Sequence, residues 1–276
     1  MKRFLFATLA LAVSIAGAAP PAAKSVRLYV IDGGLLNIPD TSPYQLQKEQ
    51  LATSVMSVAS FLIVDPKGTL IWDTGAVPDS AFQAGGPGTL RYAVSKKTLT
   101  SQLAEIGYTP ADIQYLALSH FHWDHVGNSN LFAGATWLVR QSEKDIMFAD
   151  PPSPRTEPAN FSALKNSKTI LITKDDYDVF GDGAVVIKAA PGHSPGHQVL
   201  YLKLQKTGPV VLSGDLYHYP EERKLKLIPT TEFNRDQTAR SRATIEEFLK
   251  KTGAQLWIQH DFTANAKLKK SPQFYE

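Results

Sequence analysis

Residues 115–127 read Tyr-Leu-Ala-Leu-Ser-His-Phe-His-Trp-Asp-His-Val-Gly, and this stretch joins an apolar run to a dense set of metal-binding side chains. The apolar run, residues 113–118, predicts a buried strand. Alternate residues of an extended segment project to one side, so His120 and His122 can bind the same ion. Asp124 and His125 can share a second ion only if the chain turns, which Gly127 permits. Imidazole and carboxylate ligands suit zinc and similar divalent ions.

The other histidines lie in similar places. All 7 histidines of the chain fall in candidate site segments: His120, His122, His125, His193, His197, His218 and His260. His193 and His197 lie in a turn-rich loop after an apolar run, and Asp215 and His260 each end another apolar run. Loops that follow several strands converge at one edge of a sheet. The sequence therefore predicts a dinuclear metal site at such an edge.

These motifs resemble the metallo-β-lactamase superfamily, and within it the N-acyl homoserine lactonase group. The resemblance rests on the His-x-His-x-Asp-His motif and on four other segments: Trp72–Gly75, Gly107–Pro110 with Asp112, Pro191–Gln198, and Gly214-Asp215 followed by a late His260. It extends from about Val26 to the C-terminus. Strand and helix patterns alone indicate an α/β protein; the resemblance implies a four-layer αβ/βα sandwich.

The same resemblance implies how the ligands divide between two ions. His120, His122 and His193 would bind the first ion, Asp124, His125 and His260 the second, and Asp215 would bridge them. Two divalent metal ions, with zinc favoured, would then supply a bridging hydroxide that attacks an ester or lactone carbonyl. Asp124 would carry a proton to the leaving alkoxide, and Asp73 would orient the His-x-His loop. For His197, which has no ligand position left, hydrogen bonding within its loop is expected.

One position departs from the lactonase pattern. The group often has a tyrosine three residues after the bridging aspartate, where it polarises the substrate carbonyl. In this chain that residue is His218, flanked by Tyr217 and Tyr219. Tyr217 and His218 are the catalytic candidates besides Asp124, and the sequence leaves open which of the three neighbouring side chains is the donor.

Other activities on the same site remain open. An aryl esterase, an organophosphate triesterase or a glyoxalase II-type thioesterase would use the full ligand set, whereas class B3 β-lactamases lack a bridging aspartate such as Asp215. From a different class, a persulfide dioxygenase would use fewer ligands and one iron. A structural zinc protein is disfavoured, because structural sites are usually closed by four ligands.

The N-terminus predicts export. Lys2 and Arg3 precede an apolar run to Ala18, and Ala16-Gly17-Ala18 supplies a small-x-small cleavage site. We therefore expect a signal peptide at 1–18 and one hydrolase domain at 19–276. The apolar run is too short for a membrane anchor, and with no cysteine in the chain neither a disulfide nor a lipid-modified cysteine anchor can form. A secreted or periplasmic location is expected.

The partner predicted by these features is a small lactone or ester with an apolar chain. Removing Lys2 and Arg3 lowers the net charge from +3 to +1, and no basic block indicates a nucleic-acid partner. The oligomeric state is left open, a homodimer included. Leu35, Leu36, Tyr44 and Trp123 could form an apolar wall beside the ions. Leu35 and Leu36 belong to residues 33–39. The sequence is compatible with two interpretations of this segment, a loop that closes over the site as a flap and an ordinary buried connection.

Overall fold

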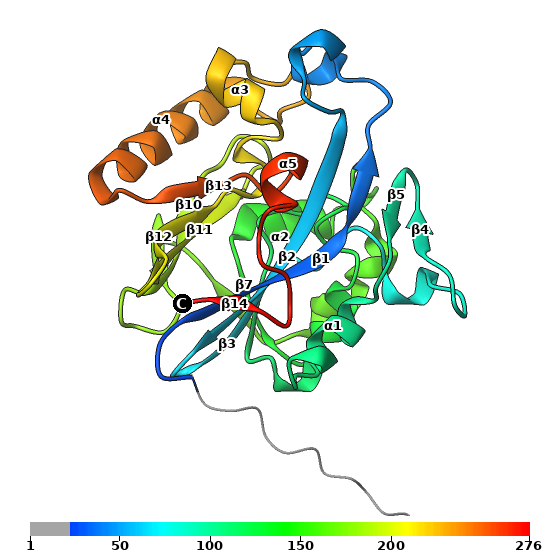
Figure 1. The fold of residues 1–276 in the computed structure, drawn as a ribbon, viewed down its shortest axis with the longest axis vertical. Coiled ribbons are helices and arrows are strands. Elements are labelled where there is room, and N and C mark those ends of the chain that lie inside the picture. The colour runs from blue at the N-terminus through cyan, green and yellow to red at the C-terminus, as the bar shows by residue number, and fades with distance from the viewer. Residues whose placement is uncertain (1–22) are drawn as a thin grey trace, which may run out of the picture.

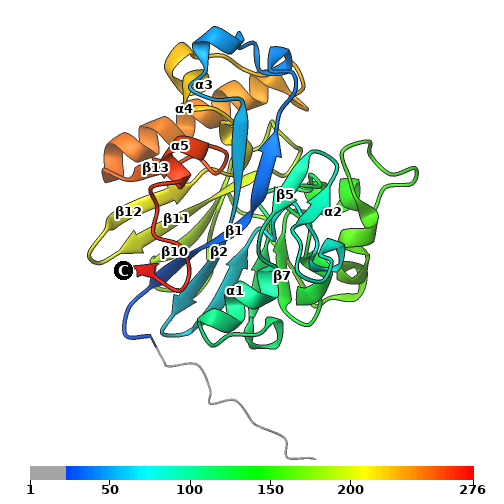
Figure 2. The same cartoon turned by 45° about the vertical axis from the view of Figure 1, so that its right-hand side comes forward.

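The computed structural model describes residues 23–276, and the predicted signal peptide at 1–18 lies outside them. Two mixed β-sheets pack face to face, with helices on both outer faces (Figures 1 and 2). The predicted four-layer αβ/βα sandwich is therefore confirmed. No helix in the described residues is long and apolar enough to cross a membrane.

The larger sheet contains the N-terminal strands and is nine-stranded. Its path runs β4-β5-β1-β2-β3-β6-β7-β8, and β14 pairs with β1. The strands are β1 Arg27–Asn37, β2 Val55–Asp65, β3 Gly68–Trp72, β4 Gly88–Leu90, β5 Ala93–Ser95, β6 Tyr115–Ala117, β7 Thr136–Val139, β8 Thr169–Leu171 and β14 Phe274–Tyr275. Strands β3, β6, β7 and β8 are parallel, so the loops that leave them emerge at one edge.

The smaller sheet has five strands in the order β13-β12-β11-β10-β9. Its strands are β9 Asp176–Asp178, β10 Val185–Ala189, β11 Gln198–Leu204, β12 Gly208–Leu212 and β13 Gln255–Trp257. Only the β12–β13 pair is parallel; the other pairs are antiparallel. Five helices complete the sandwich: α1 Leu99–Glu105, α2 Gln141–Met147, α3 Pro220–Leu225, α4 Arg235–Thr252 and α5 Phe262–Asn265.

Side-chain alternation along β2 shows how the layers are held. Phe61 and Ile63 point into the core between the two sheets, whereas Leu62 and Val64 point into the core shared with α1 and α2. All four are buried. A strand covered on both faces reads as a continuous apolar run because both side-chain directions meet protein. Burial of a large aliphatic or aromatic side chain contributes about 1.5 to 3 kcal/mol, so these strands form a rigid platform for the loops.

The structure resolves the interpretation of residues 33–39, because most of this segment is strand. Strand β1 continues to Asn37 through a register shift between Asp32 and Leu35. Gly34 makes this possible with φ of +121°, a conformation that L side chains rarely adopt. Residues 33–37 are therefore strand, so neither interpretation that the sequence left open, a flap loop or an ordinary buried connection, describes them.

Candidate metal centre

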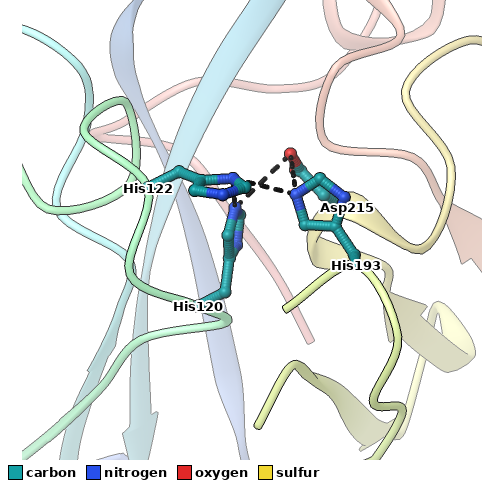
Figure 3. Close-up of side chains that lie close together, drawn as sticks. All are labelled: His120, His122, His193 and Asp215. Atoms are coloured by element: carbon teal, nitrogen blue, oxygen red, sulfur yellow. Dashed lines mark hydrogen bonds and ion pairs between the residues drawn. The ribbon is translucent and has the colours of Figure 1, made fainter. Parts of the chain in front are cut away.

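The seven predicted ligands lie together at the edge of the sandwich where the loops leave the strands. His120, His122, Asp124 and His125 follow β6, His193 follows β10, Asp215 follows β12 and His260 follows β13. They form two groups whose potential ligand atoms lie within 4.8 Å of one another: His120, His122, His193 and Asp215 in the first, and Asp124, His125 and His260 in the second. All seven residues are buried. Figure 3 shows the first group, with the three imidazoles and the carboxylate pointing toward one another.

Asp215 lies between the two groups. Its Oδ2 is 3.3 Å from His193 Nε2 and 3.5 Å from His120 Nε2. Its Oδ1 is 3.0 Å from His125 Nε2 and 3.1 Å from His260 Nε2. Burial alone would raise the pKa of Asp215, but the surrounding histidines hold it well below its usual value. One ionised carboxylate thus faces both groups, each with a different oxygen, and is suited to bridge two ions.

The outer ring nitrogens of four histidines have partners that turn the inner nitrogen toward the cluster. His125 Nδ1 is 2.9 Å from Asp73 Oδ2, and His193 Nδ1 is 3.0 Å from Glu232 Oε1. His260 Nδ1 is 2.8 Å from the Ser57 carbonyl oxygen, and His120 Nδ1 is 3.0 Å from Ser119 Oγ. When the outer nitrogen donates its proton, the inner nitrogen presents a lone pair.

These lone pairs face one another. His122 Nδ1 lies 2.8 Å from His120 Nε2 and 2.9 Å from His193 Nε2. Burial is the main reason that the pKa values of His120 and His122 lie well below the usual histidine value, so both rings are neutral. His122 Nδ1 carries one proton or one lone pair, so it can pair fully with only one of the two nitrogens beside it, whereas a divalent cation can accept a lone pair from each ring. The donor set therefore fits a metal ion.

The side chain of Asp73 anchors the His-x-His loop. The backbone of Asp73 itself has a φ of +55°. Its carboxylate accepts hydrogen bonds from Ser119 N at 2.6 Å and Ser119 Oγ at 2.8 Å, besides facing His125. Gln259 Nε2 donates to the same carboxylate at 2.8 Å. The orienting role expected for Asp73 matches these contacts, and Gln259 adds a tie to the loop that carries His260.

Two buried glutamates in the site region were missed by the sequence analysis. Glu143, on α2, accepts hydrogen bonds from Phe121 N and Gly196 N, both at 2.7 Å, and from Ser194 Oγ. Burial raises its pKa to about 7. Glu232 faces His193 and accepts a hydrogen bond from Thr238 Oγ1 at 2.6 Å. Neither residue belongs to a local motif, so nothing in the sequence marks it.

Backbone contacts explain two glycines and His197. A Cβ on Gly127 would lie only 2.6 Å from the Gly75 carbonyl oxygen. Glycine is therefore required at the end of the motif, where its backbone contacts that of Gly75. The expected loop hydrogen bonding of His197 is confirmed: Nδ1 donates to the Ala190 carbonyl at 2.8 Å, and Nε2 accepts from Asp215 N at 2.9 Å. A Cβ on Gly214 would lie 2.7 Å from that Nε2. His197 thus fixes the backbone of Asp215.

Of the three candidate donors after Asp215, only His218 lines the cavity at the metal centre. Tyr217 Oη donates to Glu246 Oε1 at 3.1 Å, and Tyr219 Oη donates to the Ser54 carbonyl at 3.0 Å. Among the donors that the sequence left open, the geometry favours His218, because the hydroxyls of Tyr217 and Tyr219 are bound elsewhere and neither residue lines the cavity. Burial alone would lower the pKa of His218, but Glu222 and Asp215 raise it to about 10.

The cavity has a volume of about 360 Å³ and is continuous with the metal centre. One wall is apolar, formed by Leu36, Ile38, Tyr44, Met56 and Trp123, so three of the four predicted wall residues line it and Leu35 does not. Arg155, at the end of the proline-rich segment 150–155, lines the rim of the cavity. Its carbonyl oxygen accepts a hydrogen bond from Trp123 N at 3.1 Å, which ties this rim to the central motif.

The family model described as the metallo-beta-lactamase superfamily matches residues 53–257. The chain belongs to the metallo-β-lactamase superfamily. Its membership and its metal-binding clusters make it a metal-dependent hydrolase, as the sequence predicted.

Relatives and solved structures narrow the likeness within the superfamily. The N-acyl homoserine lactonase AttM of Azorhizobium caulinodans is 28% identical over 271 residues, covering 91% of this chain and 99% of AttM. A structure described as a quorum-quenching N-acyl homoserine lactone lactonase superposes with a TM-score of 0.75 at 24% identity, covering 91% of this chain and 98% of its own. The structure of an N-acyl homoserine lactone hydrolase with N-hexanoyl-L-homoserine at its catalytic metal centre superposes with a TM-score of 0.73 at 25% identity. The match covers 91% of this chain and 99% of that one. The resemblance to the lactonase group is confirmed.

Proposed function

We propose that this protein is an exported, dinuclear metal-dependent lactonase that opens N-acyl homoserine lactones. The observation that carries the proposal is the apolar wall of the cavity, which begins beside the predicted metal ligands and offers a place for an acyl chain. The relatives support the choice of substrate, since AttM is named an N-acyl homoserine lactonase. A structural neighbour that holds N-hexanoyl-L-homoserine at its metal centre supports it further.

Two divalent ions fit the side chains described above, and zinc is our proposal for both. His120, His122 and His193 would hold one, Asp124, His125 and His260 the other, and Asp215 both. When bound, such ions lower the pKa of water to near neutrality and polarise carbonyl oxygens. The surrounding carboxylates Asp73 and Glu232 orient the imidazoles through their outer nitrogens.

The chain's own residues divide the remaining tasks. Asp124 lines the cavity at the centre and is placed to deliver a proton to the alkoxide released on ring opening. His218 also lines the cavity, with Nε2 toward Asp215, and would contact the substrate carbonyl. The acyl chain would lie along Trp123, Leu36 and Met56, where each buried methylene contributes about 0.8 kcal/mol to binding.

A substrate panel on metal-loaded protein tests the proposal. It would contain acyl homoserine lactones of increasing chain length, an aryl ester, S-lactoylglutathione, a β-lactam and a phosphotriester. We expect kcat/KM to be highest for the lactones and to rise from short to medium chains. Turnover of the aryl ester or the phosphotriester with every lactone inert would reject the lactonase and leave a hydrolase of another specificity.

A further inference from the structure

A buried acid lies directly behind His218. Glu222, in α3, is fully buried, and its Oε1 is 3.2 Å from His218 Nδ1. Its other oxygen, Oε2, is 2.7 Å from Nη2 of Arg242 in α4. Among residues 23–276 neither His218 Nδ1 nor Glu222 Oε1 makes an aligned hydrogen bond, so their 3.2 Å approach is an ion-pair contact. The polar environment of the outer nitrogen of His218 is therefore set by this one carboxylate.

Arg242 fixes the acid in place. Its Nε donates to the Leu216 carbonyl oxygen at 2.7 Å, and its Nη1 donates to the Leu227 carbonyl oxygen. These two carbonyls bracket the segment that carries His218 and Glu222. The guanidinium also stacks over the Tyr217 ring, at 4.2 Å from its centroid. A buried carboxylate is costly unless it is paired, and Arg242 pairs it while holding the backbone on both sides.

An imidazole needs such support more than a tyrosine does. Rotation about its second side-chain torsion exchanges ring nitrogens for carbons, so a partner on one nitrogen decides where the other points. On the far side of the ring, Nε2 is 3.3 Å from Asp215 Oδ2, and the Tyr44 ring lies 4.9 Å away between centroids. Tyr44 packs on the ring but supplies no polar partner for it.

We propose that Glu222, anchored by Arg242, is a positioning residue that fixes the His218 ring with Nε2 toward the reacting centre. An assembly of three residues from α3, α4 and the loop before α3 thus occupies the place where the lactonase pattern has one tyrosine. This inference rests on the proposed function only in taking His218 as the group that contacts the substrate.

The test is a double-mutant cycle of Glu222→Gln and His218→Ala, with kcat, KM and metal content measured for each variant. Glu222→Gln alone should lower kcat about 10- to 100-fold, the scale of a misplaced catalytic group, with KM changed less than threefold and both ions retained. In the His218→Ala background the same substitution should change kcat less than twofold. Equal losses in the two backgrounds would overturn the proposal, because a structural role does not depend on His218.

Glu246→Gln is the matched control. Glu246 is also a helical glutamate paired with an arginine, Arg223, and with a tyrosine hydroxyl, but it does not reach the cavity. Its replacement should leave kcat within twofold. If Glu222→Gln fails to fold, nitrogen NMR of the zinc-loaded wild type decides instead: the His218 signals, identified by their loss in His218→Ala, should show a protonated Nδ1, and an unprotonated Nδ1 would overturn the proposal.

The cycle is run on whichever ester in the panel is turned over fastest. Inert lactones beside an active aryl ester would reject the proposed substrate while the His218–Glu222 coupling is still measured. The two failures are therefore distinguishable.

Discussion

Glu143 Oε1 accepts a 2.7 Å hydrogen bond from the backbone amide of Phe121, the residue between His120 and His122. The same carboxylate binds Ser194 and Gly196, just after His193. One buried side chain on α2 therefore connects the two loops that bring the first group of ligands together. A hydrogen bond to each loop fixes their separation, and with it the distance between imidazoles.

Replacing Glu143 should loosen that group. In Glu143→Gln, an amide nitrogen takes the place of one accepting oxygen, so the Phe121 or the Gly196 amide loses its partner. We expect metal affinity to fall about 10- to 100-fold, the usual scale for groups that orient ligands. Competition with a chelator, followed by elemental analysis, measures this. Glu157 forms an exposed ion pair with Arg91, so Glu157→Gln is the control and should leave the metal affinity unchanged. Unchanged affinity in Glu143→Gln would contradict the role of Glu143.

The apolar wall predicts a chain-length trend. Trp123→Ala removes an aromatic wall residue, so kcat/KM should no longer rise from short to medium acyl homoserine lactones, while both metal ions remain bound. Each methylene that loses its contact forfeits about 0.8 kcal/mol, nearly fourfold in kcat/KM. A trend as steep as that of the wild type would show that the chain lies elsewhere. Leu35 was predicted to be part of the wall but does not line the cavity, so Leu35→Ala is the matched control and should keep the chain-length trend.

His218 and Tyr217 give opposite expectations. His218→Ala should lower kcat on the order of 10²-fold with little change in KM, because the lost contact develops in the transition state. Tyr217→Phe should leave both constants close to wild type, since its hydroxyl bonds Glu246 outside the cavity. Steady-state kinetics on the best panel substrate measures both. A large loss in Tyr217→Phe beside an unaffected His218→Ala would reverse the assignment.

Export predicts a processed N-terminus. Cleavage after Ala18 would leave a mature chain that begins at Ala19, four residues before the described structure starts. N-terminal sequencing of the protein recovered outside the cytoplasm checks this. Exported material that still begins at Met1, or protein found only in the cytoplasm, would reject the signal peptide.

Sequence reasoning located the ligands because each follows an apolar run, and such runs become strands whose ends share an edge. Helical patterns at 99–106 and 141–148 likewise predict α1 and α2, each one residue longer than the structure shows. An apolar stripe at Ala243, Ile245, Phe248 and Leu249 predicts a helix from Arg240 to Lys251. Helix α4 begins five residues earlier because its first turn is polar and its start depends on Asn234, whose side chain accepts a hydrogen bond from Gln237 N.

What the sequence could not supply were contacts between distant segments. Glu143 and Glu222 lie on short helices with no motif around them, and their roles depend on how those helices dock. The continuation of β1 past Gly34 was missed for a related reason. Two adjacent glycines indicate a loop, and only pairing with β2 and β5 shows that the strand continues.

Asp215 is the residue on which the dinuclear site depends most, since its two oxygens face the two ligand groups. The most direct measurement is the metal content of wild type and Asp215→Ala, together with mass spectrometry of N-decanoyl homoserine lactone incubated with each. The account predicts about two divalent ions per wild-type chain and conversion of the lactone to the ring-opened acid. It predicts loss of at least one ion and nearly all conversion in Asp215→Ala. One equivalent of iron in the wild type, or unimpaired ring opening by Asp215→Ala, would contradict it.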